Sequence, residues 1–127
     1  MRLFLKMFSV MALILSIAGV PATAGQTPEV REIPVKNMVT MVDLGAKFCV
    51  PCKLMAPILA ELEKEYQGRA AVIFIDIREQ KGKAKEFNVS TIPTQIFYDN
   101  SGQEVWRHVG FLDKESIKEK LDALLQK

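Results

Sequence analysis

Short apolar or alternating segments are spaced along the chain and predict five β-strands. These segments cover residues 29–33, 38–44, 70–77, 94–98 and 103–109. The first alternates and is ended by Pro34, which is typical of a short edge strand. The segment at 70–77 is almost continuously apolar, as expected for a strand buried on both faces. The last two strands are separated by turn-forming residues and therefore form a hairpin.

Apolar residues at helical spacing predict three helices that alternate with the strands. The first covers about 49–66 and has Pro51 in its first turn, where the missing N–H does no harm. A weaker helix is predicted at 79–87, and the last follows Asp113, a good N-cap residue. The order β-β-α-β-α-β-β-α predicts an α/β fold, with a central mixed β-sheet flanked by helices on both faces.

The N-terminal segment has the features of an export signal. Two basic residues lie among the first six, residues 7–20 are almost wholly apolar, and Ala22-Thr23-Ala24 offers small residues at a cleavage site. We expect residues 1–24 to be a signal peptide and 25–127 to be an exported, periplasmic or extracytoplasmic domain. The alternative is an uncleaved membrane anchor, although a spanning helix needs roughly 20 apolar residues.

Composition and charge indicate the number of domains and the kinds of partner that the chain can have. The chain has 127 residues, of which 49% are hydrophobic and 25% charged, so it has the length and composition of one ordinary globular domain. Removing Arg2 and Lys6 from the 17 basic residues leaves 15, equal to the 15 acidic residues. A nucleic-acid surface needs clustered basic charge. We therefore expect no nucleic-acid partner, and we expect a monomer.

The two cysteines carry the most specific chemical signal. Cys49 and Cys52 are the only cysteines, and a bridge between them closes too small a loop to add much stability. Their place at the start of a helix brings the sulfurs within one turn and stabilises a thiolate on Cys49. The hypothesis is that Cys49 attacks a substrate disulfide and that Cys52, which is deeper, resolves the mixed disulfide.

Several segments together resemble the thioredoxin family. They are Asp43-Leu44-Gly45-Ala46-Lys47-Phe48-Cys49-Val50-Pro51-Cys52-Lys53, Ala56-Pro57, Ile92-Pro93-Thr94 and Val109-Gly110. The resemblance covers the chain from about Met38 onward. It implies a thioredoxin fold and a thiol–disulfide oxidoreductase that acts on protein disulfides. Because the segment before Met38 is short, we expect the family's first helix to be reduced or absent.

The resemblance also implies roles for individual residues. Pro93 is expected to be cis, and the backbone of Ile92 to pair with an extended substrate segment. Asp43 is expected to be a buried acid that takes a proton from Cys52. Gly110 would let the substrate approach closely. We expect the remaining substrate-binding surface to consist of Phe48, Val50 and Pro51.

Each of these roles has a simpler alternative. Pro93 could merely open a strand, Asp43 could face solvent near a strand end, and Gly110 could merely end a strand.

The chain also departs from the family pattern. Gly45 and Phe48 stand where members usually have tryptophan, and Phe74 stands where many have a lysine near the buried acid. The Val50-Pro51 pair is similar to that of exported thioredoxin-like proteins that serve cytochrome c maturation. Because no histidine separates the cysteines, we expect a reductant. The resemblance implies a membrane thiol transporter as its electron donor.

Two alternatives use the same residues differently. A copper chaperone could bind Cu(I) through Cys49 and Cys52. A structural zinc site needs four ligands, and this chain offers these two cysteines and the distant His108. A non-catalytic binding module of the same fold is the other alternative, but it would not need an intact cysteine pair. We expect no metal and no cofactor beyond the Cys49–Cys52 disulfide.

Overall fold

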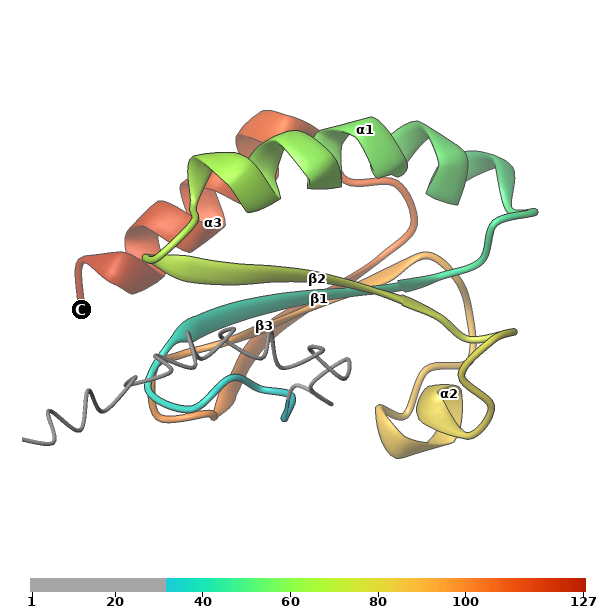
Figure 1. The fold of residues 1–127 in the computed structure, drawn as a ribbon, viewed down its shortest axis with the longest axis horizontal. Helices are drawn as coiled ribbons and strands as arrows, with labels where there is room; N and C mark the ends of the chain where they lie inside the picture. The colour runs from blue at the N-terminus through green and yellow to red at the C-terminus, as the bar shows by residue number, and fades with distance from the viewer. Residues whose placement is uncertain (1–31) are drawn as a thin grey trace, which may run out of the picture.

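The computed structural model describes residues 32–127 and shows a four-stranded mixed sheet (Figure 1). The strands are β1 (Val39–Gly45), β2 (Ala70–Asp76), β3 (Thr94–Tyr98) and β4 (Glu104–Val109). Their order across the sheet is β2-β1-β3-β4. β1 pairs with β2 in parallel, whereas β3 is antiparallel to both β1 and β4. Each strand lies within one residue of its predicted bounds.

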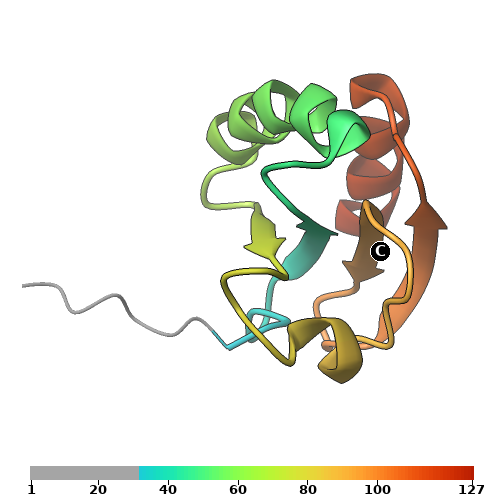
Figure 2. The same cartoon turned by 90° about the vertical axis from the view of Figure 1, so that its right-hand side faces the viewer.

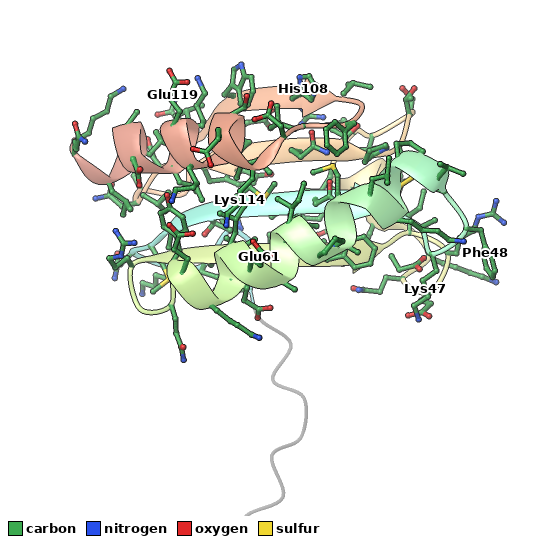
Figure 3. All side chains as sticks on the ribbon, turned by 90° about the horizontal axis from the view of Figure 1, so that it is seen from above. Lys47, Phe48, Glu61, His108, Lys114 and Glu119 are labelled. Atoms are coloured by element: carbon green, nitrogen blue, oxygen red, sulfur yellow. A yellow bond between two sulfur atoms is a disulfide. The ribbon has the colours of Figure 1, made fainter. Side chains whose placement is uncertain are left out.

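Helices cover both faces of this sheet, as predicted. α1 (Val50–Glu65) and α3 (Lys114–Leu125) lie side by side on one face, and the short α2 (Lys83–Glu86) lies on the other (Figures 1 and 2). Asp113 caps α3 by accepting a hydrogen bond from the Ser116 amide at 3.0 Å. Side chains also join the two long helices, because Lys114 donates to Glu61 at 2.8 Å (Figure 3).

The strands alternate their side chains between two cores, as the pleat of a sheet requires. The core under α1 and α3 includes Val39, Met41, Met55, Leu59, Leu62, Phe97, Ile117 and Leu121. The core on the α2 face includes Val42, Leu44, Ile75, Phe87, Ile96 and Tyr98. Burial of this apolar surface is the main force that holds the helices on the sheet.

The second helix is shorter than the sequence pattern predicts. The prediction covered 79–87, but only Lys83–Glu86 is helical. The carboxylate of Asp76 accepts hydrogen bonds from the amides of Arg78 and Glu79, which holds the chain in a turn after β2. Gly82 then has φ 91°, a left-handed conformation that ends the turn where the helix begins.

The described residues before β1 cover only part of the segment for which a strand at 29–33 and a signal peptide at 1–24 were predicted. Of the predicted strand at 29–33, only Glu32 and Ile33 are described, and neither lies in a strand. Residues 32–38 contain no helix, and the predicted signal peptide at 1–24 lies outside the described residues. Within 32–127, no helix is long and apolar enough to cross a membrane.

Candidate active site

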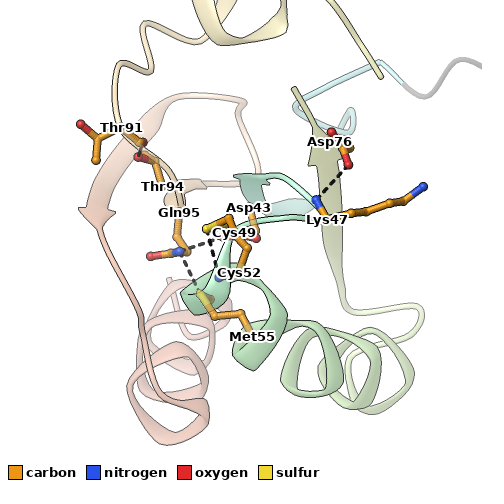
Figure 4. Close-up of a disulfide and its surroundings, with 9 residues drawn as sticks. All are labelled: Asp43, Lys47, Cys49, Cys52, Met55, Asp76, Thr91, Thr94 and Gln95. Carbon is orange, nitrogen blue, oxygen red and sulfur yellow. Dashed lines mark hydrogen bonds between the residues drawn. A yellow bond between two sulfur atoms is a disulfide. The ribbon is translucent and has the colours of Figure 1, made fainter. Parts of the chain in front are cut away.

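Cys49 and Cys52 lie where the central strand gives way to a helix. β1 ends at Gly45, and Cys49 is the N-cap residue of α1. The two cysteines form a disulfide with 5.2 Å between their Cα atoms (Figure 4). The Cys49 Sγ also accepts a hydrogen bond from the Cys52 amide at 3.3 Å. The predicted pairing across the first helical turn is therefore confirmed.

The two sulfurs have different surroundings. Cys49 is half-buried, whereas Cys52 is only 4% exposed. The unpaired amides and the positive end of the helix dipole at the start of α1 favour a negative charge on Cys49. The first turn of α1 has no acidic residue whose negative charge would weaken this effect. This arrangement stabilises negative charge on the outer sulfur and shelters the inner one.

The turn that delivers Cys49 to the helix is fixed by a hydrogen bond to β2. The backbone amide of Lys47 donates to Asp76 Oδ2 at 3.2 Å (Figure 4). The Lys47 ammonium pairs with Glu79. The Cys49 amide donates to the Ala46 carbonyl at 3.2 Å. Asp76 therefore supports the site, although no sequence pattern singled it out.

Asp43 lies within β1 and is completely buried, so the alternative of a solvent-facing residue is wrong. Burial raises its pKa from the ordinary value of 3.8 to about 6, because the buried carboxylate loses its hydration. A hydrogen bond from Gln95 opposes this effect and lowers the pKa. A carboxyl group with such a pKa changes its protonation state near neutral pH.

Gln95 is a site residue that the sequence analysis missed. Its Nε2 donates to Asp43 Oδ1 at 2.7 Å and to Met55 Sδ at 3.2 Å (Figure 4). Gln95 is completely buried and lies directly opposite Asp43 in the β1–β3 pairing. The available signal was a polar residue inside the apolar strand 94–98, the same signal that drew attention to Asp43.

The Ile92–Pro93 peptide bond is cis, as the resemblance implies. Pro93 is buried, Ile92 is half-buried, and β3 begins with the next residue. The Gly110 amide donates to the Pro93 carbonyl at 2.8 Å, so Gly110 lies beside Pro93. Gly110 has φ 102°, a conformation that favours glycine. The structure thus places these two predicted substrate-binding residues together.

Apolar side chains surround the cysteines at the surface. Phe48 is 86% exposed and Val50 70% exposed, while Pro51 is half-buried. Phe48 projects from the end of the molecule where α1 begins (Figure 3). Exposed aromatic and aliphatic groups of this kind are available to cover an apolar partner.

The part of the chain that the structure describes holds no group of three or more His, Cys, Asp or Glu side chains that could bind a metal ion. Cys49 and Cys52 are bonded to each other. His108 is half-buried, and its Nε2 lies 3.1 Å from the Phe111 carbonyl oxygen. The disulfide is the redox group of this site.

Known proteins are similar to this chain in sequence. The family model described as thioredoxin matches residues 27–123. Thioredoxins of Staphylococcus aureus strains MW2, N315 and USA300 are each 41% identical over 91 residues. That alignment covers 72% of this chain and 86% of each relative.

A cysteine pair at a strand–helix junction of such a sheet defines a thiol–disulfide oxidoreductase with the thioredoxin fold. The chain belongs to the thioredoxin family, which confirms the resemblance seen in the sequence. As a member of this family it acts on protein disulfides, and it needs no cofactor beyond its own redox-active disulfide.

Proposed function

We propose that this member of the thioredoxin family is exported and reduces protein disulfides outside the cytoplasm, with Cys49 as nucleophile and Cys52 as resolving thiol. The observation that carries the assignment is the contrast between the two sulfurs. Cys49 is the more accessible and sits at the helix N-terminus, whereas Cys52 is almost completely buried one turn further on. Accessibility and thiolate stabilisation together favour the outer sulfur as the attacking group.

The reaction consists of two exchanges. The Cys49 thiolate attacks one sulfur of the substrate disulfide, forms a mixed disulfide and releases the other substrate sulfur as a thiolate. Cys52 then attacks Cys49 Sγ, which breaks the bond to the substrate and forms the Cys49–Cys52 disulfide. The substrate gains two electrons and leaves as a dithiol, and the protein is oxidised.

Asp43 is proposed to take the proton that Cys52 must lose before it attacks. A buried thiol cannot pass its proton directly to solvent, and the pKa of Asp43, about 6, lets its carboxylate accept a proton near neutral pH. The acid then gives this proton to the released substrate thiolate or to water, which returns Asp43 to its ionised form.

Substrate binding is proposed to use the surface around the pair. The Ile92 backbone next to cis-Pro93 would pair with an extended segment of the substrate. Phe48, Val50 and Pro51 would cover apolar side chains of that segment. Gly110, which is tied to Pro93, has no Cβ that would hold the substrate backbone away.

The cellular role rests on the sequence. The signal-like residues 1–24 support export, and the Val50-Pro51 pair supports a role in cytochrome c maturation as a reductant. An exported reductant needs electrons from across the membrane, so we propose a membrane thiol transporter as donor. We propose a monomer as the working form.

A trapping experiment tests this proposal. Cys52→Ser, expressed at full length in the native cell, should hold substrates as mixed disulfides through Cys49, and the double variant Cys49→Ser/Cys52→Ser is the matched control. We expect captured extracytoplasmic proteins, apocytochromes among them, and a mature chain that begins at Gly25. Capture of only cytoplasmic proteins would refute export, and capture no greater than in the double variant would refute the role of Cys49.

A further inference from the structure

A row of four residues crosses the sheet beneath α1 and α3. Phe74 on β2, Asp43 on β1, Gln95 on β3 and His108 on β4 lie opposite one another in the strand pairings. Asp43 therefore has an aromatic residue on one side and an uncharged amide on the other. The polar partner of the buried acid comes from β3 rather than from β2.

The amide of Gln95 has one favoured orientation. Its Nε2 lies 2.7 Å from Asp43 Oδ1 and 3.2 Å from Met55 Sδ, and both of these atoms are acceptors. Exchange of the nitrogen and oxygen positions would place Oε1 against the same two acceptors and lose both hydrogen bonds. The nitrogen therefore points at Asp43 and the oxygen points away, as Figure 4 shows.

The two oxygens of Asp43 consequently differ. Oδ1 accepts the hydrogen bond from Gln95, whereas the buried Oδ2 has no hydrogen-bond partner among residues 32–127. A proton on Oδ1 would compete with the donor that already points at it. A proton on Oδ2 meets no such donor.

From these contacts we propose that Gln95 is a positioning residue for disulfide exchange, which holds Oδ1 of Asp43 and leaves Oδ2 to receive the proton of Cys52. This inference rests on the proposed role of Asp43 as proton acceptor. Cys52–SH and the carboxylate become the Cys52 thiolate and Asp43 Oδ2–H, and the thiolate then displaces the substrate sulfur from Cys49.

An uncharged donor suits this task. Among the described residues no charge contributes to the pKa shift of Asp43, which arises from burial and from the opposing Gln95 hydrogen bond. The residues that lie opposite Asp43 on the two neighbouring strands, Phe74 on β2 and Gln95 on β3, carry no charge. His108 is the other ionisable residue of the row, and Gln95 lies between it and Asp43.

The test uses the oxidised protein, in which no thiol titrates, with ¹³C-labelled aspartate carboxyl groups. The wild-type Asp43 resonance should titrate with a midpoint of about 6. Gln95→Met keeps the length of the side chain but removes the donor, so the midpoint should rise by about one pH unit or more. Ile96→Val, on the opposite face of β3, and His108→Asn should leave the midpoint unchanged.

A second measurement follows the chemistry. The pH profile of single-turnover reduction of insulin disulfides should move upward in Gln95→Met by the same interval as the NMR midpoint. A purely structural role for Gln95 would lower stability without moving that profile. If Gln95→Met does not fold, Gln95→Asn, which is one methylene shorter and does not reach Oδ1, serves in both measurements.

The outcomes separate the two proposals. An unchanged Asp43 midpoint in the folded Gln95 variant, or a shifted midpoint that the reduction profile does not follow, overturns the role of Gln95. If Asp43→Asn itself leaves the reduction profile unchanged, the proposed role of Asp43 fails and the role of Gln95 fails with it.

Discussion

Phe74 lies against the backbone of Gly45, beside the buried cysteine of the pair. A Cβ atom at position 45 would be 3.1 Å from Phe74 Cε2 and 3.1 Å from Cys52 Sγ. Any side chain at position 45 would therefore need the space that these two residues occupy. The two departures from the family pattern explain each other, because Phe74 from β2 covers Cys52 where this chain has no tryptophan.

This relationship predicts that Gly45 and Phe74 are coupled energetically. Gly45→Ala should lower the free energy of unfolding of the oxidised protein by about 1–3 kcal/mol, because the bridged Cys52 cannot move away. The double variant Gly45→Ala/Phe74→Ala should lose less than the sum of the single variants, since one of the two clashes is gone. Urea unfolding measures all three, and strict additivity would show that the two residues do not share this space.

Asp43 should make the stability of the oxidised protein depend on pH in an unusual direction. Its folded pKa of about 6 lies above its ordinary value, so the folded chain binds the proton more tightly than the unfolded chain does. The stabilising effect is complete below about pH 4 and is lost as the pH rises through about 6. The loss amounts to about 3 kcal/mol.

Asp43→Asn should therefore match the wild type near pH 4 and exceed its free energy of unfolding at pH 8. Asp113→Asn is a control of opposite sign, because hydrogen bonds from Ser116 lower the pKa of Asp113. Asp113→Asn should lower the free energy of unfolding at pH 8, and this loss should become smaller as the pH falls. A difference between Asp43→Asn and wild type that is the same at pH 4 and pH 8 would contradict the raised pKa of Asp43.

Phe48 should matter for binding and not for folding. At 86% exposure its truncation to alanine should change the free energy of unfolding by less than about 0.5 kcal/mol. The KM for a protein disulfide substrate should rise roughly threefold to tenfold, because apolar contact area is lost. Reduction of a small aromatic disulfide measures the kcat of the chemical step without the contacts of a protein substrate. Val105→Ala is the control, because Val105 is also an exposed apolar residue and lies near the start of β4. A fall in kcat with unchanged KM would place Phe48 in the chemistry instead.

Gly110 should combine a stability effect with a binding effect. Its φ of 102° makes Gly110→Ala cost about 1–2 kcal/mol of backbone strain, although its Cβ would meet no atom within 4 Å. Gly68 has φ 79° and equally open space, so Gly68→Ala is a matched control for strain away from the site. Only Gly110→Ala should also raise the KM for a protein substrate. Equal KM values in the two variants would remove Gly110 from the binding surface.

The sheet, its helices and the cysteine pair could be predicted from the sequence, because each depends on residues that are close together in the chain. The strands came from apolar runs, and the site came from the position of Cys49 at a strand–helix junction. The length of α2 could not be predicted, because the hydrogen bonds that end its preceding turn come from the single carboxylate of Asp76.

The partner of Asp43 was missed for a related reason. Gln95 is 52 residues away along the chain, and only the β1–β3 register brings the two together. A buried glutamine and a buried aspartate each stand out in an apolar strand, but a sequence alone does not pair them. The same holds for Gly45 and Phe74, which meet through the parallel pairing of β1 with β2.

The most direct measurement of the central claim is residue-resolved alkylation of the fully reduced protein with iodoacetamide between pH 5 and pH 9. Cys49 should react at pH 7 faster than free cysteine, whose pKa is about 8.5, because the start of α1 stabilises its thiolate. The buried Cys52 should react far more slowly. A Cys49 that reacts no faster than the free amino acid, or a Cys52 that reacts first, would contradict the assignment of nucleophile and resolving thiol.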